Sequence, residues 1–151
     1  MILYLHWLGW AVWLGAQLTF MVWGPAVKDA PLATWAHTWD TLSKVQRWIV
    51  APGCAVATLT GIVLSMEYAQ PGAVAEGSSV VIMQILGLLA AVLTIVLATP
   101  LANRMAYLAA RSAETGARDA RAEPARKKLA LVSSVSGALI LVTLYVAALK
   151  P

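Results

Sequence analysis

Four long apolar runs dominate the pattern of hydrophobic and polar positions along the chain. They cover about residues 2–23, 48–69, 80–101 and 129–148, and each is nearly free of formal charge. A run of about 20 apolar residues is enough for a helix to cross a bilayer. The runs are continuous, whereas the strands of a membrane barrel alternate over about ten residues. The pattern therefore predicts an all-α fold, a four-transmembrane-helix bundle that forms a single membrane domain.

The connections between the runs carry most of the polar residues. The first connection, about 24–47, is long enough to hold a short interfacial helix over 34–47. The third connection, about 103–128, is rich in alanine and in charge. Its composition predicts that the third helix continues beyond the membrane and breaks near Gly116 or Pro124.

The basic residues are distributed unevenly between the connections. All of the 11 lysines and arginines except Lys150 lie in the first and third connections, and the second connection, about 70–79, has none. Basic residues are enriched in the cytoplasmic loops of membrane proteins. The distribution therefore predicts that the first and third connections face the cytoplasm, with the N- and C-termini on the non-cytoplasmic side.

The composition agrees with a membrane protein. Hydrophobic residues make up 60% of the chain and charged residues 12%, which is about half of the charged fraction of a typical soluble domain. Membrane topology and contact with lipid head groups account for the net charge of +4, so we expect no nucleic acid partner. The predicted location is the bacterial inner (cytoplasmic) membrane.

One ionisable residue stands out in the first run. His6 is the only histidine in any apolar run, and an ionisable group inside a membrane indicates a functional site. At helical spacing it shares a stripe with Trp10, Trp13 and Gln17. We expect this stripe to face the interior of the bundle. Its tryptophans suit either packing and interface anchoring or the wall of a haem, pigment or quinone site.

Matching depths between the helices places further side chains near the level of His6. These are Met66 of the second run, and Met83 and Gln84 of the third. An imidazole is a common axial ligand of haem, and methionine can supply the sixth ligand. Imidazole with thioether also suits copper, so His6, Met66 and Met83 are candidate metal ligands. The candidate cofactor-binding set is His6, Trp10, Trp13 and Gln84, with haem b as the cofactor and copper as the alternative.

A structural role for His6, with no cofactor bound, is also plausible from the sequence. An unpaired imidazole N–H in hydrocarbon would lose the free energy of a hydrogen bond, so His6 then needs a polar partner on another helix. The depth match favours Gln84 as that partner, followed by Ser65 and Tyr145.

Two stretches of the chain carry a family resemblance. The first is HWLGWAVWLG at 6–15, followed by VWGPA at 22–26, and the second covers 48–61 and includes Pro52. These stretches resemble the CopD-like superfamily of small bacterial membrane proteins and, more remotely, the HemJ-type protoporphyrinogen oxidases. The resemblance implies a four-helix unit with a histidine in its first helix, here His6. The resemblance to CopD-like proteins associates that unit with copper uptake, and the resemblance to HemJ-type proteins associates it with haem binding and porphyrin oxidation.

Three classes of function follow from these observations. The first is a small membrane protein that binds haem or copper through His6. The second is a non-catalytic accessory subunit of a larger respiratory or photosynthetic membrane complex. The third is a small transporter or a haem-pathway enzyme. The expected partners are the lipid bilayer and either other membrane subunits or further copies of the same chain.

Overall fold

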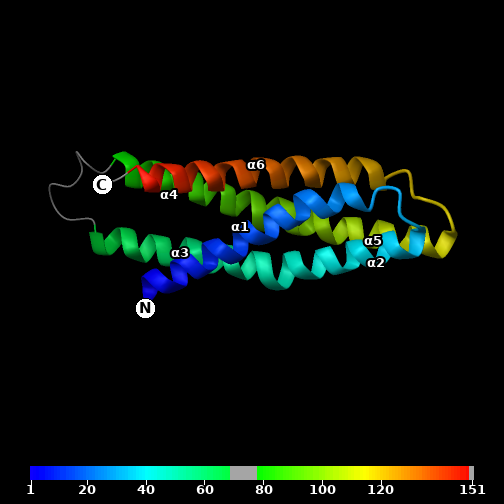
Figure 1. The fold of residues 1–151 in the computed structure, drawn as a ribbon, viewed down its shortest axis with the longest axis horizontal. Helices are drawn as coiled ribbons and strands as arrows, with labels where there is room; N and C mark the ends of the chain where they lie inside the picture. Colours follow the sequence, from blue (N-terminus) through cyan, green and yellow to red (C-terminus); the bar gives the residue numbers. More distant parts are fainter. Residues whose placement is uncertain (69–77, 150–151) are drawn as a thin grey trace.

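The computed structural model describes residues 1–68 and 78–149, which form four helical rods packed along one another (Figure 1). Successive rods run in opposite directions, and α1 begins at the end of the bundle where α6 finishes. The described residues contain no strand, so the predicted all-α helical bundle is confirmed. The rods are α1 (Ile2–Ala26); α2 (Leu32–Val45), η1 (Gln46–Val50) and α3 (Ala51–Tyr68); α4 (Ser78–Val92), η2 (Leu93–Ala98) and α5 (Thr99–Thr115); and α6 (Ala122–Ala148).

Three of the rods contain a segment that is long and apolar enough to cross a membrane. These segments are Leu32–Met66, Ser79–Thr115 and Ala122–Ala148. The first rod, α1, has 25 residues and no charged side chain, but its four tryptophans, His6 and Gln17 lower its hydropathy. The lengths and compositions are those of an integral membrane protein.

Two of these segments are longer than a bilayer requires. Leu32–Met66 has 35 residues and Ser79–Thr115 has 37, and each is about 50–55 Å long at the rise of an α-helix. The hydrocarbon core of a bilayer is only about 30 Å thick. The rods therefore continue beyond the predicted spans. We call the end that holds α2, α5, the first turns of α6 and the connections 27–31 and 116–121 the basic end.

The helix boundaries differ from the sequence-based prediction at the basic end. The prediction of a separate interfacial helix over 34–47 is wrong, because α2 continues without a break through η1 into α3. The fourth helix begins at Ala122, earlier than the predicted residue 129. The break near Gly116 is confirmed, since this glycine ends α5 with a left-handed φ of 70°. Most of the predicted second connection falls on residues 69–77, which lie outside the described residues.

Each of the two long rods contains a short π-helical segment just before a proline. The segment η1 precedes Pro52, and η2 precedes Pro100. Proline lacks an N–H, and its ring clashes with the carbonyl group four residues earlier, so a regular α-helix is interrupted there. A π turn inserted in the helix absorbs this interruption. Both rods therefore stay continuous through their prolines.

Buried apolar side chains form two clusters along the bundle. The basic-end cluster joins α2, α5 and the start of α6, which bury one face and expose charged residues on the other, as helices of water-soluble proteins do. The α1 cluster lies where α1 crosses the bundle. The basic-end cluster consists of Val27, Trp35, Trp39, Leu42, Met105, Leu108, Ala109, Ala122 and Ala125. The α1 cluster consists of Trp10, Trp13, Val50, Cys54, Ala57, Ala90, Ala91 and Ile140.

Arg118 ties together the two connections at the basic end. Its guanidinium donates hydrogen bonds to the backbone oxygens of Lys28 and Ala30. The same group lies 5.1 Å from the centre of the Trp35 ring, in a cation–π arrangement. One exposed side chain therefore holds the connection 116–121 against the connection 27–31.

The neighbouring Asp119 is paired with Arg121 at 2.7 Å. The hydrogen bonds from Arg121 hold the pKa of the Asp119 carboxyl well below its usual range. A carboxyl group with a lowered pKa in the folded state stabilises the fold above its unfolded-state pKa of about 3.9. This contribution is lost as the pH falls through the lower pKa of the folded state, and it is constant near neutral pH.

Replacing Arg118 by alanine is expected to lower the free energy of unfolding by about 1 kcal/mol, the scale of its hydrogen bonds and its ring contact. Limited proteolysis should then cut the connections 27–31 and 116–121 faster. Arg111→Ala is the matched control, because Arg111 is an exposed arginine of α5 whose side chain has no hydrogen-bond partner among the described residues. Equal proteolysis of the two variants would contradict the role given to Arg118.

Candidate functional site

The site is built on a close crossing of α1 and α3. A Cβ atom added at Gly9 would lie 2.7 Å from the Ala57 nitrogen and 2.8 Å from the Gly53 oxygen. Gly53, Ala57 and Gly61 follow one another at intervals of four, so they form one face of α3. Small residues at such spacing let two helix backbones come into contact. The α1 and α3 backbones therefore touch at Gly9.

His6 lies against this face and makes hydrogen bonds with both of its ring nitrogens. The Nδ1 atom is 2.9 Å from the Ala57 carbonyl oxygen and 3.1 Å from the Thr60 hydroxyl oxygen. The indole N–H of Trp10 donates to Nε2 over 3.0 Å. Because Nε2 accepts this hydrogen bond, the proton of a neutral ring is on Nδ1, which donates to the Ala57 carbonyl. His6 therefore links α1 to the backbone of α3.

The backbone of α3 leaves little free space around the His6 ring. A Cβ atom added at Gly61 would lie 2.9 Å from the Cε1 atom of His6. The ring of Trp10 meets the imidazole edge to face, with the ring centres 6.0 Å apart. A metal ion or haem iron bound at Nε2 would have to displace the Trp10 hydrogen bond.

The structure brings together only part of the predicted site. His6 and Trp10 are in contact, and Trp10 is stacked on Trp13 with the ring centres 5.2 Å apart. Gln84 is half-buried on α4, and it is not a hydrogen-bond partner of His6. The prediction that Gln84 is the hydrogen-bond partner of His6 is therefore wrong, and the next choices, Ser65 and Tyr145, are also wrong. Ser65 donates instead to the Gly61 carbonyl, and Tyr145 is 65% exposed.

The two candidate methionines differ in their exposure. Met66 is 74% exposed, and Met83 on α4 is half-buried. Among the residues that the structure describes, no group of three His, Cys, Asp or Glu side chains is placed to hold a metal ion. The sulfur atoms thus have no cluster of stronger ligands beside them within the described part of the chain.

A second polar network links α1 to the two other long rods. The indole N–H of Trp13 donates to the Thr94 hydroxyl oxygen over 3.1 Å. That oxygen is 2.8 Å from the hydroxyl of Ser136, which in turn bonds the Ala90 carbonyl over 3.2 Å. Trp13, Thr94 and Ser136 are all fully buried. The link between Thr94 and Ser136 was not predicted, because the third and fourth apolar runs each hold more than one hydroxyl residue and their pattern does not single out this pair.

The remaining polar residues near this network differ in how well they are paired. Gln46 donates to the Thr99 hydroxyl over 3.3 Å and to the Thr94 carbonyl over 3.5 Å, so η1 is joined to η2. Gln17 completes the predicted inward stripe and is 1% exposed. Neither amide atom of Gln17 has a hydrogen-bond partner in the described structure. The stripe thus faces inward as predicted, with one unpaired amide.

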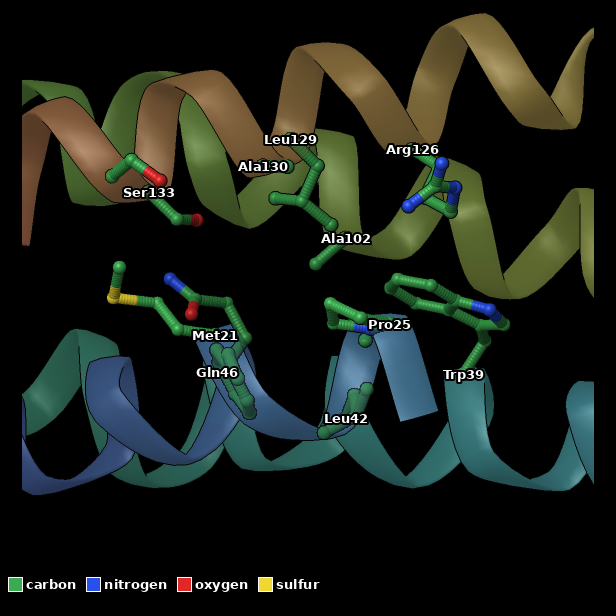
Figure 2. A pocket seen from close by; sticks show the side chains of 13 residues that line it. Met21, Pro25, Trp39, Leu42, Gln46, Ala102, Arg126, Leu129, Ala130 and Ser133 are labelled. Carbon is green, nitrogen blue, oxygen red and sulfur yellow. The ribbon is translucent and has the colours of Figure 1, made fainter. Parts of the chain in front are cut away.

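A cavity of about 210 Å³ lies next to this region, between α1 and α6 (Figure 2). Phe20 on its wall packs against both the α1 cluster and the basic-end cluster, so the cavity lies where the two clusters meet. Met21, Ala130 and Ser134 are exposed on its rim, so the cavity opens between α1 and α6. Sequence reasoning missed this cavity. It is lined by Phe20, Met21, Gly24, Pro25, Trp39, Leu42, Gln46, Ala102, Arg126, Leu129, Ala130, Ser133 and Ser134.

Comparisons of the chain with models of protein families, with curated proteins and with solved structures give no match. The CopD-like resemblance of the stretches 6–26 and 48–61 therefore stays a prediction. The fold and the site have to be interpreted from their own geometry.

Proposed function

We propose that this chain is an integral protein of the bacterial inner membrane in which all four rods cross the bilayer. The exposed tryptophans of α1 support this for the first rod. Trp7 is 56% exposed and Trp23 is 51% exposed, and the helix between them is about 24 Å long. Tryptophan is enriched at both membrane interfaces, and this separation approaches the thickness of the hydrocarbon core. The uneven distribution of basic residues supports an orientation with the basic end in the cytoplasm and both termini outside it.

The function we propose is that of a non-catalytic accessory subunit of a larger membrane complex. The observation that carries this proposal is the pairing of His6, whose two ring nitrogens bond Ala57 and Trp10. The second network, from Trp13 through Thr94 to Ser136, is buried and likewise closed within the bundle. Groups that already hold one another stabilise a scaffold, and they are not free to bind substrate.

Replacing His6 by alanine is expected to lower the free energy of unfolding by about 1–2 kcal/mol, the cost of losing its part-buried hydrogen bonds. The absorption spectrum and the metal content of the purified protein should not change. His37→Ala is the matched control, because His37 is exposed on α2, and it should leave the stability unaltered. Denaturant titration in detergent, with the spectrum recorded on the same samples, measures both effects.

Binding of haem or copper through His6 is the second candidate. One observation favours it: the partner of Nε2 is Trp10, a side chain of the same helix, so rotation of that indole alone would free the nitrogen. Trp13, which now stacks on Trp10, would then form one wall of the cofactor site. A Soret band, or stoichiometric copper, that disappears in His6→Ala would establish this candidate and overturn the scaffold role of His6.

A further inference from the structure

The cavity between α1 and α6 lies at the level where the membrane is expected to end. Trp23, next to the cavity-lining Gly24, is 51% exposed. Arg47 and Trp48, next to the cavity-lining Gln46, form an exposed cation–π pair with 5.3 Å between the guanidinium carbon and the ring centre. Exposed tryptophan and arginine side chains are typical of the membrane–water interface. The cavity is therefore open to lipid near the head-group level.

The cavity has two different ends. Figure 2 shows Arg126 and Trp39 on opposite walls at one end, and Met21, Gln46 and Ser133 at the other. Most of the wall between them is apolar, including Phe20 and the residues Leu42, Ala102, Leu129 and Ala130. An elongated molecule with a polar head and an apolar chain would match this arrangement.

Hydrogen-bond donors remain unused at the Arg126 end. The indole N–H of Trp39 has no partner in the described structure, although Trp39 is only 5% exposed. Arg126 bonds Glu123 through Nε and Nη2, at 2.9 and 2.7 Å. Its Nη1 has no partner among the described residues. A buried donor that lacks a partner is rare in native proteins, so the Trp39 N–H indicates a ligand with an acceptor atom. The Arg126 side chain is 19% exposed, and its Nη1 is a charged donor at the same end of the cavity.

We propose that the cavity binds an anionic amphiphile, with one acyl chain along the apolar wall and the phosphate or carboxylate head on Arg126 and Trp39. Arginine is well suited to such groups because its guanidinium donates several hydrogen bonds in one plane. The exposed Lys127 and Lys128 on the same turn of α6 add positive charge beside the opening. The partner is a lipid or a fatty acid taken from the surrounding membrane.

Displacement of cis-parinaric acid, a fluorescent fatty acid, from the full chain in an uncharged detergent tests this proposal. Oleate, phosphatidylglycerol and oleyl alcohol serve as competitors. Competition by oleate alone identifies a carboxylate ligand, and competition by phosphatidylglycerol alone identifies a phospholipid. Oleyl alcohol should be at least about tenfold weaker, the scale of a lost hydrogen bond to a charged group. Equal competition by oleyl alcohol, or failure of the probe to bind, would overturn the proposal.

Matched variants locate the binding. Ala130→Phe places a phenyl ring at the cavity opening and should weaken probe binding at least about tenfold by steric exclusion, whereas Ala138→Phe, at an exposed alanine two turns along α6, should not.

Arg126→Gln should weaken binding about tenfold and Glu123→Gln should strengthen it, because Glu123 competes for the guanidinium. Lys128→Gln removes one charge outside the cavity and is the control for Arg126→Gln. Equal effects of Arg126→Gln and Lys128→Gln would contradict the assigned head-group position.

Discussion

Replacing Gly9 by alanine is expected to destabilise the protein by about 3 kcal/mol, the upper part of the usual range for overpacking. The added methyl group would meet the Ala57 nitrogen at 2.7 Å and the Gly53 oxygen at 2.8 Å. Both are backbone atoms, which cannot move aside as the end of a side chain can. The α1 helix would therefore have to separate from α3, and the hydrogen bonds of His6 to α3 would be lost with it.

Gly15→Ala is the matched control for this substitution. Gly15 lies on the same helix, and a Cβ atom there would have nothing within 4 Å. Alanine favours a helix over glycine by up to about 1 kcal/mol, so this variant should be neutral or slightly stabilised. Unfolding in mixed micelles, followed by circular dichroism, gives both values. Similar losses for the two variants would show that α1 and α3 do not touch at Gly9.

Replacing Thr94 by valine is expected to cost about 2 kcal/mol, because it leaves the indole N–H of Trp13 buried without an acceptor. Valine matches threonine in shape, so the loss reports the hydroxyl group itself. The same hydroxyl bonds Ser136, which retains the Ala90 carbonyl as an acceptor. Thr19→Val is the control, because the exposed hydroxyl of Thr19 bonds only the Gly15 carbonyl of its own helix.

A double-mutant cycle separates this hydrogen bond from general packing effects. In a Trp13→Phe background no indole N–H remains that could lose its acceptor. Thr94→Val should therefore lower the free energy of unfolding clearly less than it does in the native chain. The difference between the two costs is the coupling energy of the pair. Additive costs, with no coupling, would show that Trp13 and Thr94 are not bonded in the folded protein.

The sequence was sufficient to predict the helices and the inward face of α1. Helical periodicity alone places Trp10, Trp13 and Gln17 on one stripe, and all three are buried. Runs of apolar residues marked the bundle, because a lipid-exposed helix is apolar on its whole surface. At the basic end, the continuation of the third predicted helix beyond the membrane was predicted, but the continuity of α2 with α3 was missed. The α2 segment is amphipathic and its average composition is polar, so it was interpreted as a separate interfacial helix.

The partner of His6 could not be predicted by matching depths. Depth matching assumes straight, parallel helices and considers side chains only, whereas His6 bonds the backbone carbonyl of Ala57. That carbonyl is accessible because glycines let α1 cross α3 at close range. The cavity was missed for a related reason: it depends on how α1 lies against α6, which no local pattern encodes. Its two distinctive donors, Trp39 and Arg126, come from segments far apart in the chain.

Cysteine labelling from one side of the membrane tests the four-span topology most directly. Cysteines placed at the exposed positions Leu3, Ala117 and Leu149 are treated in spheroplasts with a membrane-impermeant maleimide. The native Cys54 is fully buried and should not react. Our account predicts labelling at positions 3 and 149 in intact spheroplasts, and at position 117 only after permeabilisation. Labelling of positions 3 and 149 from opposite sides would show that α1 does not cross the membrane. Labelling of position 117 from outside would reverse the orientation. Either result would contradict the account.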